Sequence, residues 1–272
     1  MPLTTTAPGA KAADGVEILG RAGLAARGLV YLLVGWLALL VAFGDHGRQA
    51  DREGAVATIA ARSYGTALLA ALALGMVGYA VWRATEAATG RTSREADADA
   101  GTRLRSLATA VLHIGFAISI ARFAVTHRGD GGEEEQSLTA VALGWPGGRL
   151  LVAGAGLAVV GVGLFNGYRA VTGSFMERLK RGELGDASER TVRVLGTAGH
   201  LGRGAGFTLV GLFVVRAAIT LDPTEAKGLD GALKEVAAEW YGPPVLVVLA
   251  AGFAAFGVYS LAEARWRRVL GR

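Results

Sequence analysis

Residues 20–35 read GRAGLAARGLVYLLVG and residues 196–211 read GTAGHLGRGAGFTLVG, so four glycines and one arginine recur at a constant offset of 176. Further along, residues 54–87 match residues 231–264 at an offset of 177, and a weaker copy lies about 82 residues after the first. Self-similarity at a fixed offset is typical of repeat architectures. We therefore predict three tandem copies of one unit, with the middle copy the most diverged.

Each copy contains two apolar blocks. The six blocks, which carry few or no internal charges, lie at residues 23–43, 67–88, 104–126, 150–171, 194–219 and 245–262. Each is close to the ~20 residues that a membrane-spanning helix needs. The chain is 52% hydrophobic with a mean hydropathy of +0.39, which is too apolar for an ordinary soluble domain. The pattern favours an all-α polytopic membrane protein with six transmembrane helices over a soluble protein with long buried helices.

The even number of crossings in each copy predicts how the copies are arranged. Because the chain returns to the same side after each copy, the copies enter the membrane in the same orientation, related by an axis along the membrane normal. We therefore expect three parallel two-helix repeats in a pseudo-threefold bundle. The predicted boundaries are a disordered cytoplasmic tail at 1–16, repeat 1 at 17–90, repeat 2 at 102–173 and repeat 3 at 190–268.

Each copy also has a short apolar segment beside its spans, at residues 55–61, 138–143 and 232–240. An aromatic residue and a glycine follow each segment, and aromatic side chains at this depth suit the lipid headgroup region. We interpret the segments as short helices lying on the outer leaflet, with a plain loop as the alternative.

The basic residues predict orientation and partners. Nineteen of the 28 Lys and Arg residues fall on the side of the membrane that holds both termini, which predicts cytoplasmic termini in a plasma-membrane protein. The net charge of +5 could suggest nucleic acid, but basic loops beside spans favour the lipid bilayer and its anionic headgroups instead. Protein partners are not indicated. The chain has no cysteine, which excludes disulfides and thiolate metal sites.

Ionisable residues inside the spans are the main candidates for a site, because burying a charge in a membrane is costly. Arg27 and Arg203 occupy equivalent positions in repeats 1 and 3, and Glu86 and Glu263 do the same. The middle copy loses both, with Thr109 in place of the arginine and Tyr168-Arg169 at the acid position. Joint loss suggests that Arg27 pairs with Glu86 and Arg203 with Glu263, each within its own hairpin. The alternative is a site for an anion or lipid headgroup made by the arginines.

Two further arginines, Arg122 and Arg216, occupy matching positions toward the outer ends of the third and fifth spans. Facing inward they would form a cationic outer vestibule, and facing outward they would extend to the interface. His113, which replaces an aromatic residue, is interpreted as a packing residue.

Motifs for catalysis or metal binding are missing from the sequence. No histidine pair has the spacing of the zinc helix motif, and no serine lies in a nucleophile elbow. We therefore predict no catalytic, cofactor-binding or metal residues, and expect a protein that is not an enzyme.

The repeat resembles a known family. The stretches that carry the resemblance are GLAARGLVY at 23–31, GHLGRG at 199–204, and the Gly-x-x-Leu-Leu entries at 65–69 and 147–151. They are similar to an actinobacterial membrane family catalogued as domain of unknown function 1206, over about residues 17–268. The middle copy departs from the pattern at Thr109-Ala110. The resemblance implies a six-helix plasma-membrane protein and no particular activity.

For function, the sequence favours a structural or interaction component of the membrane. A small transporter or channel for an anionic or lipid-like solute, running along the pseudo-threefold axis, is the main alternative. An intramembrane enzyme is a third possibility, which would need a convergent polar cluster at one depth.

Overall fold

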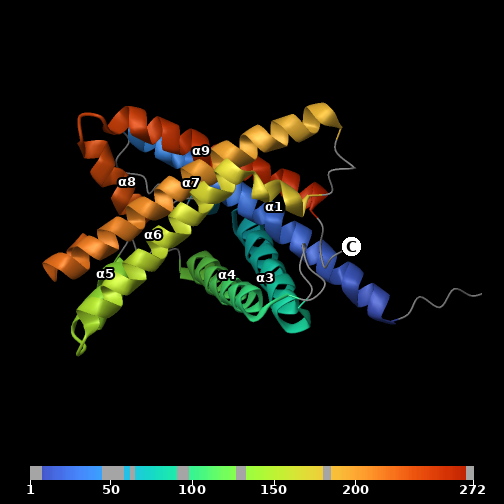
Figure 1. Ribbon diagram of the computed structural model, residues 1–272, viewed down its shortest axis with the longest axis horizontal. Coiled ribbons are helices and arrows are strands. Elements are labelled where there is room, and N and C mark those ends of the chain that lie inside the picture. Colours follow the sequence, from blue (N-terminus) through green and yellow to red (C-terminus); the bar gives the residue numbers. More distant parts are fainter. Residues whose placement is uncertain are drawn as a thin grey trace, which may run out of the picture.

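A computed structural model describes residues 8–44, 58–61, 65–90, 98–126, 133–179 and 185–267, and this part of the chain is dominated by helices (Figure 1). The long helices are α1 (Pro8–Ala42), α3 (Gly65–Thr89), α4 (Ala100–Thr126), α6 (Gly148–Thr172), α7 (Asp186–Thr220) and α9 (Gly242–Trp266). Each includes a stretch long and apolar enough to cross a membrane, which confirms the predicted six spans. The described residues also form two short helices, α5 (Glu133–Leu143) and α8 (Leu229–Ala238), two 3₁₀ turns, η1 (Ser174–Arg178) and η3 (Pro223–Glu225), and a helical turn at residues 58–60.

The start of α1 differs from the prediction. Residues 8–16 were assigned to the disordered tail, but the helix begins at Pro8. Proline suits the first turn of a helix, where its missing N–H would have no partner, and the alanines that follow have the highest helix propensity. Residues 1–7 lie outside the described part.

The short apolar segments are helical where the structure describes them. Residues 138–143 lie in α5, and most of 232–240 lies in α8, as predicted; of 55–61, residues 58–60 are helical, and residues 55–57 fall outside the described residues. After α5, Gly147 adopts a φ of +79° and turns the chain directly into α6, which ends at Gly173 with a φ of +66°. Only glycine enters this left-handed region without strain, so these two residues set the length of α6.

The six long helices pack in the order α4, α3, α1, α9, α7, α6. Within copies 1 and 3, α1 packs on α3 and α7 on α9. Between copies, the first helix of each copy packs on the second helix of the preceding one: α4 on α3, α7 on α6, and α1 on α9. Figure 1 shows the α6–α7 pair crossing the α1–α9 pair. These contacts have the pseudo-threefold pattern that the repeat predicts.

The pseudo-threefold bundle is nevertheless not closed, because α4 and α6 of the middle copy make no extensive contact with each other. In copy 1, Gly23 of α1 approaches α3 so closely that an added Cβ would lie 2.7 Å from the carbonyl oxygen of Gly75. Gly199 occupies the same position in copy 3, but the middle copy has Arg105 there. A long charged side chain prevents close approach of two backbones, so the ring opens inside the middle hairpin.

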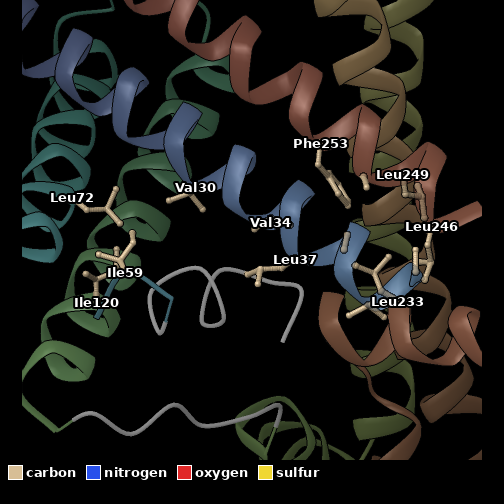
Figure 2. Close-up of a cluster of buried hydrophobic side chains, with 14 of the residues drawn as sticks. Val30, Val34, Leu37, Ile59, Leu72, Ile120, Leu233, Leu246, Leu249 and Phe253 are labelled. Atoms are coloured by element: carbon tan, nitrogen blue, oxygen red, sulfur yellow. The ribbon is translucent and has the colours of Figure 1, made fainter. Parts of the chain in front are cut away.

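The largest cluster of buried apolar side chains lies along α1. Figure 2 shows Val30, Val34 and Leu37 of α1 beside Leu249 and Phe253 of α9, and the cluster continues to α3, α4 and α8. By contrast, only 24% and 22% of the most apolar windows of α4 and α6 are buried, against 53% for α3 and 50% for α9. The middle copy therefore presents most of its apolar surface outward.

Candidate functional site

Charged side chains gather at one end of the bundle, which we call the Arg-rich end. It is formed by the beginnings of α1, α4 and α7 and the ends of α3, α6 and α9. Two carboxylates, Glu86 and Glu263, are buried there at 1% and 2% exposure. Around them lie six arginines: Arg27, Arg83, Arg169, Arg178, Arg203 and Arg267. The cluster therefore carries a large excess of positive charge.

Glu263 is held by two arginines at the interface between α1 and α9. Arg27 donates to one carboxylate oxygen and, through Nε, to the Ser260 hydroxyl at 3.2 Å. Arg267 donates to the other carboxylate oxygen at 2.8 Å, and this arginine is only 1% exposed. The prediction that Arg27 pairs with Glu86 in its own hairpin is wrong. Gly28 packs on α9 and brings the neighbouring Arg27 to that helix instead.

At the interface between α3 and α4, Glu86 is paired within its own helix. Arg83 donates to the Glu86 carboxylate, and the Ser106 hydroxyl of α4 lies 3.4 Å from the same oxygen. Arg83 also donates to the Tyr79 hydroxyl at 3.0 Å. Thr109, where the other copies have an arginine, offers no cation. Glu86 therefore takes a local partner.

The interfaces of α1 with α9 and of α7 with α6 have the same backbone geometry. A Cβ added to Gly28 would lie 2.9 Å from the Gly257 carbonyl oxygen of α9, and a Cβ added to the equivalent Gly204 would lie 2.8 Å from the Gly163 carbonyl oxygen of α6. A second contact gives the same register. Gly35 of α1 approaches the carbonyl oxygen of Ala250 in α9, and the equivalent Gly211 of α7 approaches the carbonyl oxygen of Gly156 in α6. Position 257 thus corresponds to 163, and 250 to 156.

This register shows which residues of α6 correspond to the α9 residues that bind Arg27. Where α9 presents Ser260 and Glu263 to Arg27, the corresponding positions of α6 are Asn166 and Arg169. The predicted pair of Arg203 with Glu263 is wrong, because Arg27 and Arg267 bind the two carboxylate oxygens of Glu263, and the register puts an arginine at the acid position of α6. Within the described residues, no carboxylate forms an ion pair with Arg203. Its guanidinium lies over the rings of Tyr31, Phe207 and Phe256, at 5.8, 5.1 and 4.9 Å from their centroids.

Several polar atoms of this region are buried without a hydrogen-bond partner: Nε of Arg169, Nε of Arg203, Oδ1 of Asn166, and Nε and Nη2 of Arg267. In η1, burial and the neighbouring cations Arg169 and Arg267 lower the pKa of Arg178 well below its usual range. Unpaired buried cations are strongly unfavourable. The α6–α7 interface therefore has the chemistry to attract an anion.

The histidines in the spans contribute to packing. The ring of His113 lies 4.5 Å from the Tyr79 ring, and that of His200 stacks on Phe175 at 4.8 Å. Nδ1 of each ring lies 2.8 Å from a backbone carbonyl oxygen one helical turn earlier. Over the described ranges, no group of three histidine or acidic side chains is placed to hold a metal ion.

The two outer arginines do not behave alike. Arg216 donates to Glu225 of η3 at 2.8 Å and is 54% exposed, so its charge is balanced beside it. η3 thus brings a carboxylate to the outer end of α7, and the place of Arg216 in a cationic vestibule stays a prediction. Arg122 is exposed on α4, and its place in a vestibule stays a prediction.

Sequence reasoning does not identify Arg83, Arg178 and Arg267 as members of the cluster. Arg83 lies three residues before Glu86, and Arg267 four residues after Glu263, so helical spacing could have indicated both pairs. Asn166 of the same region donates its amide to the Val162 carbonyl oxygen of its own helix at 2.8 Å.

Six long apolar helices in three tandem copies define a multi-pass helical membrane protein. The chain belongs to the family described as domain of unknown function 1206, whose sequence model matches three times, at residues 22–90, 104–173 and 198–267. It is 32% identical over 250 residues to the uncharacterized protein YxxB of Bacillus subtilis, covering 90% of this chain and 89% of that relative. No solved structure matches. The three matches confirm the tandem copies predicted from the sequence.

Proposed function

We propose that the protein is a non-catalytic component of the plasma membrane with a structural or interaction role. The observation that supports this proposal most is that buried ion pairs hold two helices together. Arg27, Glu263 and Arg267 join α1 to α9, beside an apolar cluster that fills the space along α1. The outward apolar surfaces of α4 and α6 supply area for contact with lipid or other membrane proteins.

The orientation is part of the proposal. Basic residues near spans favour the cytoplasmic side, so we place the Arg-rich end and both termini in the cytoplasm. There the cluster lies beside the anionic lipid headgroups of the inner leaflet.

Cysteine scanning tests the role, because the native chain has no cysteine. Single cysteines at Val34, Leu37 and Leu249, which are all buried within α1 and α9, would be treated with a membrane-impermeant maleimide. A structural role predicts no labelling at these depths and strong labelling at Trp240, which is 90% exposed. Labelling at successive depths along α1 would instead reveal a water-filled path and contradict the proposal.

One observation favours a second candidate, a small transporter for an anionic or lipid-like solute. The unbalanced arginines at the α6–α7 interface lie beside helices whose outer surfaces are largely unburied. Uptake of a phosphorylated solute, or movement of an anionic lipid between leaflets of reconstituted vesicles, would support transport. Vesicles without protein are the control.

A further inference from the structure

Three equivalent interfaces join the first helix of one copy to the second helix of the preceding copy, and they differ in charge. At the α1–α9 interface, the equivalent positions hold Arg27, Ser260 and Glu263, with one cation and one anion. At the α3–α4 interface they hold Thr109, Arg83 and Glu86, again with one of each. At the α6–α7 interface they hold Arg203, Asn166 and Arg169. Of the three interfaces, only the α6–α7 interface has two cations and no anion at these positions.

We propose that a phosphate-bearing anion binds at the α6–α7 interface, where the carboxylate of Glu263 lies in the equivalent α1–α9 interface. Arg203 and Arg169 are its main ligands, and Asn166 lies three residues before Arg169 on α6. The proposal holds whether the protein has a structural role or transports a solute, because it concerns how this interface is neutralised.

Burial and unused hydrogen-bond donors support a built site. Nε of both arginines is buried with no partner, whereas Asn166, which is 4% exposed, already donates its amide to Val162, so the unused donors belong to the arginines. Arg169 and Arg203 are close enough to repel each other, and Arg178 and Arg267 add positive charge nearby. Glu263 attracts Arg169, but two arginines already occupy its oxygens. An external anion would relieve this repulsion.

The chemistry and the depth of the site favour phosphate. Guanidinium groups bind phosphate oxygens through paired, charge-assisted hydrogen bonds, and a tetrahedral group accepts donors from several directions. Arg169 lies three residues before the end of α6, or about 4.5 Å along the axis. This places it at the level of lipid headgroups. The phosphate could belong to an anionic phospholipid or to a small soluble molecule.

The experiment measures thermal unfolding of the full-length, delipidated protein in a maltoside detergent. Separate samples receive phosphatidylglycerol in phosphate-free buffer, phosphatidylcholine, inorganic phosphate, or sodium acetate, with chloride adjusted to equal ionic strength. We expect phosphatidylglycerol or inorganic phosphate to raise the midpoint by about 5 °C at saturation. Whichever of these two additions raises the midpoint identifies the source of the phosphate, lipid or soluble. No response in either arm, or an equal response to acetate, overturns the proposal.

A charge reversal makes the test specific. Arg169→Glu places a carboxylate at the position of Glu263, so Arg203 gains an internal partner and the response to phosphate should be lost. The matched control is Arg190→Glu, at an exposed position near the start of α7, with the same change in net charge. Equal loss in both variants would mean non-specific surface attraction and overturn the proposal.

A second variant keeps the test decisive if Arg169→Glu does not fold. Arg203→Gln removes one ligand and leaves α6 unchanged. We expect the apparent affinity for the responding phosphate compound to fall about tenfold or more, as for a lost charge-assisted hydrogen bond. An affinity unchanged from that of the native protein would rule Arg203 out as a ligand and contradict the proposal.

Discussion

The α1–α9 and α6–α7 interfaces have the same backbone contacts and opposite electrostatics. In each, a glycine that follows an arginine approaches a glycine carbonyl oxygen of the neighbouring helix, at Gly28–Gly257 and Gly204–Gly163. The α1–α9 interface contains a buried ion pair, whereas the α6–α7 interface contains two arginines without a carboxylate. The comparison shows that glycines determine which helices meet, because a close approach of backbones requires small residues. The charged residues differ between the two interfaces even though their glycine contacts are the same.

The largest expected effect comes from removing the carboxylate of the α1–α9 interface. Glu263→Gln leaves Arg27 and Arg267 buried without their shared anion, so we expect the free energy of unfolding to fall by about 3–5 kcal/mol. Denaturant titration of the detergent-solubilised protein measures this change. Glu239→Gln, at an exposed position, is the control. A change of similar size in both variants would mean that burial of the Glu263 ion pairs is not what stabilises the helix pair.

Replacing the interface glycine should destabilise the protein equally at the two interfaces. Gly28→Leu and Gly204→Leu each place a Cβ less than 3.0 Å from a backbone oxygen, and we expect each to destabilise the protein by about 1–3 kcal/mol. Gly154→Leu is the control, because its added Cβ has no neighbour within 4 Å. Thermal unfolding monitored by size-exclusion chromatography measures the relative stability of the three variants. If Gly204→Leu were tolerated like Gly154→Leu, the two interfaces would not be equivalent.

The arginines should respond unequally. Arg27→Gln loses charge-assisted hydrogen bonds to Glu263, at about 1.5–3 kcal/mol, and should destabilise the protein accordingly. In phosphate-free detergent, Arg203→Gln loses no ion pair and should change stability by less than about 1 kcal/mol, or even raise it. The same denaturant titration compares them. Equal losses would mean that Arg203 has a partner of its own in the protein.

The smallest effect is expected outside both interfaces, at Arg216 and Glu225. Because the Arg216 side chain is more than half exposed, solvent screens the pair, and a double-mutant cycle should give a coupling below about 1 kcal/mol. The coupling should also weaken in high salt. A coupling as large as the effect of Arg27→Gln would show that the outer end of α7 is shielded from water.

Much of the fold follows from local features of the sequence. Apolar runs of about 20 residues predict the spans, and the offsets of 176 and 177 predict the copies, because both depend only on residue type and spacing. The short helices α5 and α8 follow from apolar segments beside the spans. The open middle hairpin also has a local cause, since Arg105 replaces the glycine that copies 1 and 3 use to bring their helices together.

The partners of the charged residues do not follow in the same way. Arg27 lies at a similar depth to both Glu86 and Glu263, and depth alone does not distinguish them. The choice depends on which side of α1 faces α9, which is set by the contact of Gly28 with Gly257. Likewise, the opposition of Arg203 and Arg169 becomes visible only when the register of α7 on α6 is known.

The pairing of the first long helix with the last one affects how the protein is made. Arg27 and Glu263 are separated by 236 positions, so at 5–20 residues per second the ribosome needs roughly 10–50 s between them. During that time α1 enters the bilayer without its main partner. An arginine costs about 2.5–3.5 kcal/mol at the centre of an inserting helix and less toward its end, where Arg27 lies, and the many leucines and valines of α1 offset this cost. Biogenesis therefore passes through a stage in which every earlier span is inserted while the helix that neutralises Arg27 has yet to emerge from the ribosome.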